Sequence, residues 1–542
     1  MQPPILQPFQ HDPKGPNGFF GLSSTWSNYL SPLENGVLGR FEGEAADLAV
    51  FGEIPSEING TFYRIMVDPF YPVQEGNPPV EGDGNICALR IHNGRVDMKI
   101  RYVDTERLRL ERHANKRLFG LYRNPFSHHP CVRAAVDSTA NTNLVYWAGQ
   151  LLALKESAQP YAVDPDTLET LGYDPFKSPG KTFSAHPKVD PFTNELVVFG
   201  YEAKGLGTDD IVIYALDKDG NRRDEQWIKS PWPAFIHDCA ITANYIILVL
   251  WPYSASSIDT MRAGGQHWTY SRDLPATFIV APRRPSTFRP PSWDPSETSR
   301  VYTWDHALLM HTAGAWEDPS GNLRVESSRI FYNVFTAFDA NPPADQHTPF
   351  GNLPLRADYV RWTLDLSSPS NSRMAEPTVI LDMPGEMARI DERLLTKPYT
   401  KIFCPVILPD STKPCPTQIP ILTPGLDAYA LVDTKTETVS VFNPGDNCTV
   451  DEPIFIPRSE GAEDGDGWMM GMVHRLDVGR SDLVVVDTRE FDKVVAVVQL
   501  PFRTKGQIHG NWVDERVKVQ RGGFVRGYEK VEVSGRGALE EE

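Results

Sequence analysis

The sequence predicts an all-β protein made of many short strands, and two observations carry this prediction. Glycine and proline, 40 and 47 of the 542 residues, are spread from end to end without a low-complexity linker, as is typical of strands joined by turns. Segments that alternate apolar and polar residues recur, whereas helical periodicity is scarce. We therefore expect one domain over residues 1–542, with an N-terminal extension at 1–40 and a disordered tail at 535–542.

Three hairpins are expected in chain order, over residues 86–103, 143–156 and 210–227. Their turns contain glycine and lie at Asn93-Gly94, Ala148-Gly149 and Asp219-Gly220. Asn-Gly between alternating strands is the strongest short hairpin signal. A charged segment with apolar positions along one side, residues 104–119, predicts a helix.

A loose repeat groups the strands into larger units. An apolar strand that ends in a hydrophobic residue plus Asp occurs five times, at Val163-Asp164, Leu216-Asp217, Leu364-Asp365, Val432-Asp433 and Val486-Asp487. The intervals are 53, 148, 68 and 54 residues, and the longest has room for two or three units. Six to eight units of roughly 40–55 residues are typical of a β-propeller. The alternative is that a strand, Asp and turn are only common turn chemistry.

Charge and composition argue against several classes of function. The 53 basic and 71 acidic residues give a net charge of −18, so the chain lacks the basic excess that phosphate-based nucleic-acid binding needs. The longest apolar run, residues 245–251, is far shorter than the ~20 residues of a transmembrane helix. No signal peptide is evident, and six cysteines without C-x-x-C spacing predict neither a zinc site nor disulfides. We expect a soluble cytoplasmic protein.

Five of the thirteen histidines stand apart because they lie in apolar surroundings near strand starts: His186, His237, His306, His311 and His509. The others occupy polar or turn contexts: His11, His92, His113, His128, His129, His267, His347 and His474. A lone apolar histidine is more often a hydrogen-bonded core residue than a ligand. With His311 taken rather than His306, however, the separations of 51, 74 and 198 residues place each imidazole in a different blade.

Inner strands of a propeller converge on its axis, so four such histidines can meet without a local motif. Neutral imidazoles suit a transition metal such as Fe(II). Carboxylates behind the rings would then orient them and offset the charge of the metal.

Over nearly its whole length the chain resembles a known family, the carotenoid cleavage oxygenases. The matching blocks are Asn59-Gly-Thr-Phe-Tyr-Arg, Glu81-Gly-Asp-Gly, Ser138-Thr-Ala-Asn-Thr-Asn, Leu152-Ala-Leu-Lys-Glu, Ala185-His-Pro, Ile236-His-Asp, His311-Thr-Ala-Gly-Ala-Trp-Glu-Asp, Gly385-Glu-Met-Ala-Arg-Ile-Asp, Asp451-Glu-Pro-Ile-Phe-Ile-Pro-Arg and Gly506-Gln-Ile-His-Gly-Asn-Trp. The resemblance implies a seven-bladed β-propeller with a dome of helices and loops over its top face.

The resemblance also implies an iron site and its surroundings. The Fe(II) ligands would be His186, His237, His311 and His509, and the glutamates behind three of these rings would be Glu156, Glu386 and Glu452. The alternative is that each glutamate simply occupies a solvated position at the end of a strand. Two positions depart from the family pattern, Gly314 where Asn is usual and Met387-Ala388 where Phe-Pro is common, and we expect both to loosen the packing around the ligands.

Within the family, Lys155 and Tyr122 resemble the pair found in enzymes that cleave stilbenes. Burying an ammonium without a partner costs free energy, so a lysine in this apolar strand needs an explanation. Contact with the substrate is one explanation, and a salt bridge or a position that faces water is the alternative. An ammonium and a tyrosine hydroxyl that grip a phenol oxygen would stabilise the phenolate and aim the attached alkene at the iron. Thr142 resembles the threonine that limits the open positions of the metal, and is otherwise an ordinary strand residue. Val80 stands where stilbene cleavers tend to have Phe.

The sequence thus favours an Fe(II) dioxygenase that uses O2 to cleave the alkene of a small phenolic substrate into aldehydes. The substrate would be a 4-hydroxystilbene such as resveratrol or a 4-hydroxyphenylpropenoid such as isoeugenol or 4-vinylguaiacol. Two alternatives remain, an apocarotenoid-cleaving oxygenase of the same family and a catalytically silent binding propeller. The oligomeric state is left open.

Overall fold

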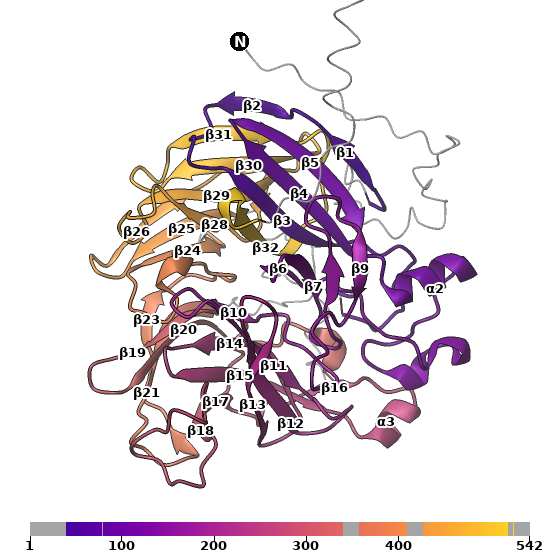
Figure 1. Ribbon diagram of the computed structural model, residues 1–542, viewed down its shortest axis with the longest axis vertical. Helices are drawn as coiled ribbons and strands as arrows, with labels where there is room; N and C mark the ends of the chain where they lie inside the picture. The colour runs from indigo at the N-terminus through magenta and orange to yellow at the C-terminus, as the bar shows by residue number, and fades with distance from the viewer. Residues whose placement is uncertain (1–38, 79, 340–356, 409–425, 519–523, 525–542) are drawn as a thin grey trace, which may run out of the picture.

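The computed structural model of the protein describes residues 39–78, 80–339, 357–408, 426–518 and 524 (Figure 1). Within these ranges the strands form seven separate sheets arranged around a centre, which is a seven-bladed β-propeller. The fold predicted from the sequence is confirmed. The tail at 535–542 and nearly all of the extension at 1–40 lie outside the described residues, so both predictions stay open.

The strands of each blade are given from the inner edge outward. The first three blades contain β32 (Gln507–Asp514), β3 (Gly60–Val67), β4 (Gly84–His92), β5 (Arg95–Tyr102) and β1 (Gly43–Ala45); β6 (Asn143–Trp147), β7 (Gln150–Leu154), β8 (Tyr161–Val163) and β9 (Thr170–Tyr173); and β10 (Lys188–Asp190), β11 (Glu195–Tyr201), β12 (Asp210–Leu216) and β13 (Arg222–Lys229). The next two contain β14 (Ala234–Ile241), β15 (Tyr245–Ala255), β17 (Ala276–Pro282), β18 (Arg300–Trp304) and β22 (Ser372–Arg373), with β16 (Trp268–Tyr270) beside β15; and β19 (Thr312–Glu317), β20 (Leu323–Ile330), β21 (Ala357–Leu364) and β23 (Thr378–Leu381). The last two contain β24 (Lys401–Val406), β25 (Ala428–Asp433) and β26 (Thr438–Phe442); and β28 (Ile454–Pro457) and β27 (Cys448–Val450) beside β29 (Gly467–Arg475), followed by β30 (Arg480–Asp487), β31 (Val494–Gln499) and β2 (Ala49–Gly52).

The ring is closed by strands from opposite ends of the sequence. In the first blade, β32 pairs antiparallel with β3, with Gly60 opposite Asp514. In the seventh blade, β2 pairs antiparallel with β31. Indigo and yellow ribbons therefore lie side by side in Figure 1.

The predicted hairpins and the repeat agree with the structure. The three hairpins are β4–β5, β6–β7 and β12–β13, and Asn93 and Gly94 have φ of 50° and 74°, as a tight primed turn requires. The five hydrophobic-Asp pairs end strands in five different blades. In each pair the Asp carboxylate accepts a hydrogen bond from a backbone N–H two residues later. The Asp therefore stabilises the turn that follows its strand, and each hydrophobic-Asp pair also marks a separate blade.

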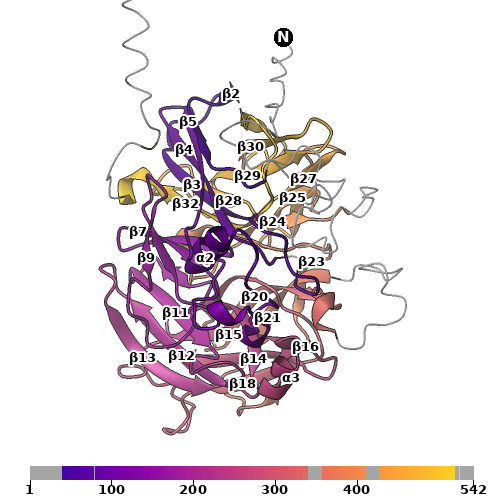
Figure 2. The same cartoon turned by 90° about the vertical axis from the view of Figure 1, so that its right-hand side faces the viewer.

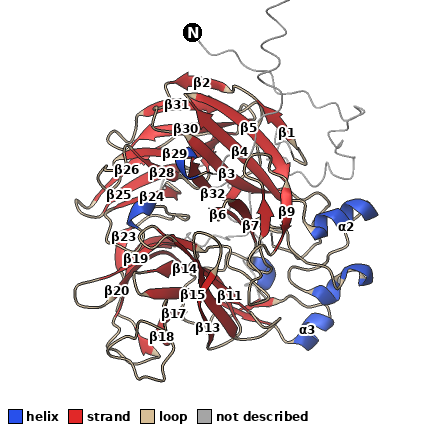
Figure 3. Ribbon diagram, viewed as in Figure 1, coloured by secondary structure: helices blue, strands red, loops and turns tan. Residues whose placement is uncertain are grey.

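The predicted helix is shorter than expected. Helix α2 spans Glu106–Ala114 and ends because Asn115 adopts a left-handed conformation, φ 50°. Beyond it the chain turns back, and the Glu111 carboxylate accepts hydrogen bonds from the backbone N–H groups of Leu118 and Phe119. The other α-helix within the described ranges is α3 (Ile258–Arg262), and Figure 3 shows that helices are few.

Long connections between strands cover one end of the propeller and form the dome. They join β3 to β4, β5 to β6 and β15 to β17, and the described residues 331–339 that follow β20 belong to the same cover. They also hold one another, since Asn77 Nδ2 donates to the Gly120 carbonyl at 3.0 Å and Gln266 Nε2 donates to the Gly76 carbonyl at 2.7 Å. Figure 1 shows α2 and α3 together on the right-hand side of the molecule, and in Figure 2 this side faces the viewer. In the part of the chain that is described, no helix is both long and apolar enough to cross a bilayer.

Candidate metal centre and substrate cavity

Four buried histidines meet at the axis below the dome. His186 and His311 lie at the starts of β10 and β19, and His237 and His509 lie within β14 and β32. Each of these is the inner-edge strand of its own blade. One nitrogen from each ring lies within 4.8 Å of the others. His306, the histidine set aside, bonds instead to Tyr270 Oη at 2.8 Å and to the Leu274 carbonyl.

The ring nitrogens are arranged as a cation site. Nε2 of His237 lies 3.0 Å from Nε2 of His186 and 3.1 Å from Nε2 of His311. Nε2 of His509 is buried without a hydrogen-bond partner. Carboxylates beside Nδ1 of His311 and His509 favour the proton on that nitrogen, so the Nε2 lone pairs of these two rings face the other histidines. Converging lone pairs repel unless a cation lies among them, and four neutral imidazoles suit a transition metal.

Each of the three glutamates lies behind a different imidazole. Glu386 accepts from His311 Nδ1, Glu452 Oε1 lies 3.2 Å from His509 Nδ1, and Glu156 Oε1 lies 3.5 Å from His237 Nδ1. All three carboxylates are buried, so the solvated strand-end alternative is wrong. This arrangement orients metal-binding rings in known sites.

Electrostatics favours charged carboxylates at this centre and uncharged rings at His186 and His509. At His311 burial lowers the pKa, but the Glu386 carboxylate outweighs it and raises the pKa. Burial alone would raise the pKa of Glu452, but His509 and Arg389 lower it to about 2. Burial and the neighbouring histidines hold the pKa of His186 well below its usual range. Burial likewise lowers the pKa of His509. Imidazoles that stay neutral keep their lone pairs available to a metal.

A cavity lined by three of the histidines, His237, His311 and His509, extends toward the dome. Its walls are mainly apolar and aromatic: Pro78, Val80, Phe235, Trp251, Met310, Phe335, Phe338 and Ile508. The Trp251 ring stacks on Phe335 at 25°, with centroids 5.8 Å apart, and lies 4.7 Å from the His237 ring. The lining, mostly apolar with a few polar groups, is that of a site for a small, mostly apolar ligand.

The polar groups of the cavity include Tyr122, Asn141, Thr142 and Lys155. Lys155 is 4% exposed, and within the described ranges its ammonium forms no ion pair. Nζ donates to Asn141 Oδ1 at 3.1 Å and lies 5.0 Å from the centre of the Tyr122 ring. Both bland alternatives for Lys155, a salt bridge and a water-facing position, are therefore wrong.

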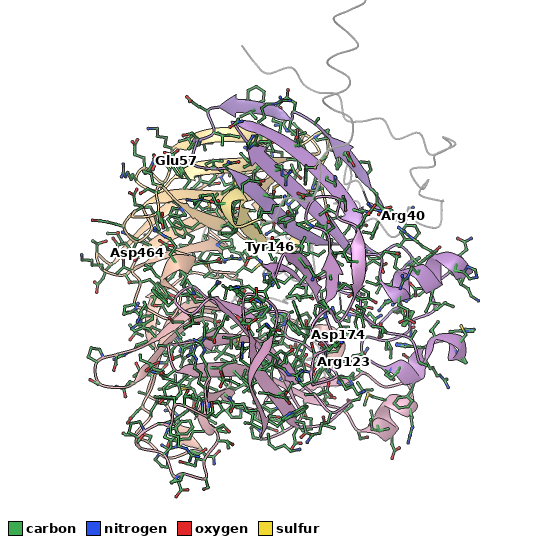
Figure 4. The ribbon with its side chains drawn as sticks, in the orientation of Figure 1. Arg40, Glu57, Arg123, Tyr146, Asp174 and Asp464 are labelled. Atoms are coloured by element: carbon green, nitrogen blue, oxygen red, sulfur yellow. The ribbon has the colours of Figure 1, made fainter. Side chains whose placement is uncertain are left out.

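Tyr122 is held in place by the dome. Its backbone N–H donates to Asn77 Oδ1 at 2.6 Å, and its hydroxyl donates to Glu156 Oε1 at 3.4 Å. The next residue, Arg123, labelled in Figure 4, forms a buried ion pair with Glu202 at 2.5 Å. Burial raises the pKa of Tyr122 well above its usual value, so the hydroxyl remains a proton donor.

The two departures from the family pattern do not loosen the centre. A side chain at Gly314 would place its Cβ 2.8 Å from the Tyr399 ring, so the space is already filled. Met387 has φ 57°, and its N–H donates to Glu386 Oε2 at 2.6 Å. The expectation of a looser site is wrong, because both positions pack tightly.

Sequence reasoning missed part of this site. The aromatic walls come from blades and dome segments far apart in the chain. The one available signal was the spacing of Phe235, which stands two residues before His237 and therefore on the same face of the strand. Asn141 lies in a block quoted for the resemblance but received no role. Three histidines assigned to polar or turn contexts are buried, His128, His267 and His474; His267 and His474 contact Glu202 and Asp451.

Comparisons with known proteins agree with this geometry. The family model described as retinal pigment epithelial membrane protein matches residues 39–514. Resveratrol cleavage oxygenase 1 of Botryotinia fuckeliana is 55% identical over 96% of this chain and 92% of that protein. Isoeugenol monooxygenase of Pseudomonas nitroreducens is 34% identical over 88% of this chain and 96% of its own. The crystal structure of Pseudomonas brassicacearum lignostilbene dioxygenase superposes with a TM-score of 0.79, at 35% identity over 88% of this chain and 96% of that one.

Proposed function

Because the chain belongs to the family of retinal pigment epithelial membrane protein and the carotenoid cleavage oxygenases, we propose that it is an Fe(II)-dependent dioxygenase that cleaves the alkene of 4-hydroxystilbenes. Resveratrol-like stilbenes are the first substrate class, and 4-hydroxyphenylpropenoids such as isoeugenol are the second. The names of the relatives at 55% and 34% identity support both classes.

The observation that carries the proposal is the buried ammonium of Lys155. In a cavity walled by aromatic rings an unpaired cation costs several kcal/mol, and here its partner is a neutral amide oxygen. A phenol oxygen placed beside Nζ and Tyr122 Oη would supply the missing anionic partner. Three of the four histidines line the same cavity, so a phenol bound there directs its conjugated alkene toward them.

Each residue group has a part in the reaction. Lys155 donates a hydrogen bond to the phenol oxygen, and the Tyr122 hydroxyl donates a second one when its single proton turns from Glu156 to the substrate. The negative charge that they stabilise makes the alkene electron-rich. The aromatic walls hold the rings flat and exclude water. Thr142 lines the cavity beside the histidines and would restrict access to them. In the overall reaction the alkene bond is broken and each carbon takes one atom of O2, which gives two aldehydes.

The four histidines would hold the iron, with Glu156, Glu386 and Glu452 fixing three rings from behind. The converging Nε2 atoms and the buried, partnerless Nε2 of His509 support this. When bound, Fe(II) supplies the redox chemistry that a reaction with O2 requires.

The test removes the phenol contacts and leaves the histidines intact. Lys155→Met and Tyr122→Phe should each lower kcat/KM for resveratrol about 100-fold, while the iron content stays at the wild-type value. Lys218→Met, which changes a lysine 68% exposed at its side chain, is the control and should match the wild type. Iron-replete Lys155→Met with an undiminished rate would refute the phenol contact.

A panel of resveratrol, its 4′-O-methyl ether, isoeugenol and an apocarotenal identifies the substrate class. We expect turnover of the free phenols and not of the ether, measured by chromatography of the aldehydes formed. Preferred cleavage of the apocarotenal would contradict the proposal, as would purified protein that neither holds iron nor turns over any of the four.

A further inference from the structure

Asn141 connects the main polar groups of the cavity, and the proposed chemistry gives it no role. Its Oδ1 accepts from Lys155 Nζ and from Thr142 Oγ1, both at 3.1 Å. Its Nδ2 donates to the carbonyls of Val80 at 2.9 Å and Gly82 at 2.8 Å. The side chain is 1% exposed, so these four bonds account for all of its hydrogen-bonding capacity.

The two carbonyls fix which way the amide points. Both protons of Nδ2 are used by acceptors on the segment between β3 and β4, so Oδ1 must face Lys155. A flipped amide would set its oxygen against two carbonyl oxygens and its nitrogen against an ammonium. The hydrogen-bond partners of the amide therefore decide its orientation.

The backbone before Asn141 is also held in an uncommon conformation. Ala140 has φ 45°, a region that costs an L-residue about 1–3 kcal/mol and persists where its surroundings impose it. Gly84 packs against the Ala140 carbonyl so closely that a Cβ at Gly84 would lie 2.3 Å from that oxygen. This contact holds the turn that directs the Asn141 side chain at Lys155.

We propose that Asn141 is a positioning residue that anchors the Lys155 ammonium with a neutral acceptor and so leaves its positive charge for the substrate phenolate. The inference rests on the proposed function. A carboxylate in this place would neutralise Lys155, and a shorter apolar side chain would release it. An amide oxygen uses one of the three ammonium protons and leaves the others for the phenol oxygen.

The experiment measures how the bound phenol ionises, with 4-nitrophenol as a probe that has no alkene to cleave and whose phenolate is yellow. Iron-loaded full-length protein is titrated with the probe across pH, and resveratrol under anaerobic conditions should displace it. Asn141→Ala should weaken phenolate binding about tenfold and raise the pH at which the bound probe ionises. Asn141→Asp should raise that pH by about one unit, which keeps the test open if the alanine variant does not fold.

Asn124 provides a matched control. It is also a buried asparagine whose Nδ2 donates to two carbonyls, those of Met261 and Gly265, but its Oδ1 accepts from the Phe126 N–H. Asn124→Ala should lower stability and leave probe ionisation unchanged. A general loosening of the dome would move both variants alike and would overturn the assignment.

The double variant separates this inference from the proposed function. In a Lys155→Met background, Asn141→Ala should produce no further change in probe affinity or ionisation. If Asn141→Ala binds and ionises the probe as the wild type does, the positioning role is overturned. The same holds if Asn141→Ala changes probe affinity and ionisation equally with and without Lys155. If Lys155→Met itself leaves the probe unaffected, the phenol contact fails instead.

Discussion

At the scale of single residues, the histidine centre depends on carboxylates whose neighbours are all hydrogen-bond donors, as Glu386 shows. Glu386 accepts from the His311 backbone N–H, His311 Nδ1, Ser328 Oγ and the Met387 N–H. These contacts favour the charged carboxylate; burial opposes them, but the pKa of Glu386 is still lowered. An uncharged amide of the same size cannot replace it, because its NH2 group would face further donors.

Glu386→Gln should therefore lower metal affinity about 10- to 100-fold, as loss of a group behind a metal-binding histidine typically does. The measurement is iron retained in competition with a chelator. Glu326→Gln is the control, because Glu326 is equally buried, in β20 of the same blade, and pairs with Arg361 instead of a histidine. Equal iron retention by the wild type and Glu386→Gln would contradict the role.

The residue scale is also where sequence reasoning was most uneven. The four histidines stood out because an imidazole in an apolar strand is unusual. Asn141 gave no such signal, because its four partners come from segments up to about sixty residues away and from its own turn. A polar residue whose role is to satisfy distant backbone groups looks like any other turn residue.

At the scale of elements, local chemistry decided what could be predicted. The β4–β5 hairpin follows from Asn93-Gly94 because both residues accept positive φ. The end of α2 did not follow from its apolar pattern, since Asn115 stops the helix by a left-handed turn and Glu111 captures the chain beyond it. Apart from α2, the dome segments show no regular apolar pattern, so their aromatic contribution to the cavity could not be foreseen.

The connection between β3 and β4 gives a pH prediction through Asp83. Burial raises the pKa of Asp83 to about 6 against the opposing effect of Arg107. Between pH 4 and 6 the folded protein therefore binds a proton that the unfolded chain has lost, so this group makes stability fall as pH rises through that window.

Asp83→Asn removes this titration. The free energy of unfolding of the wild type, relative to the variant, should fall by about 2–3 kcal/mol between pH 4 and 6 and stay level above it. Urea denaturation at a series of pH values measures the difference. Parallel curves for the two proteins would show that Asp83 does not titrate in this way.

At the scale of the whole molecule, closure of the ring depends on contacts between the two ends of the sequence. Arg64 in β3 is fully buried. It donates to Gln507 Oε1 at 3.1 Å, Thr504 Oγ1 at 2.8 Å and Asp451 Oδ2 at 2.9 Å. One guanidinium thus joins the first blade to the seventh, and the charge that it balances on Asp451 is itself buried.

Arg64→Met should lower the free energy of unfolding by about 3–5 kcal/mol, because it leaves a buried carboxylate short of a partner. Arg95→Met removes an ion pair with Asp47 in which both side chains are about half exposed and should cost less than about 1 kcal/mol. Thermal and urea unfolding compare the two. A similar small loss for both would mean that the closure does not depend on Arg64.

The architecture as a whole was predictable, but its count of blades was not. Repeat spacing alone allowed six to eight units, because the first blade and the fourth, which lies in the 148-residue interval, lack the hydrophobic-Asp signature. Seven came from the family resemblance, and the structure agrees. Which histidine of the fifth blade faces the axis, His311 rather than His306, depends on the start of β19 and became certain only in three dimensions.

The histidines of the centre and several side chains that line the substrate cavity come from different parts of the fold, and this has an evolutionary consequence. The histidines project from the innermost strands, which the whole ring holds, whereas Tyr122, Phe335 and Phe338 come from connections that cross the end of the propeller. Substitutions in the connections can therefore change which substrate is recognised, while the inner strands keep the histidine centre intact. A lineage built in this way can acquire new substrates by small steps without passing through an inactive ancestor.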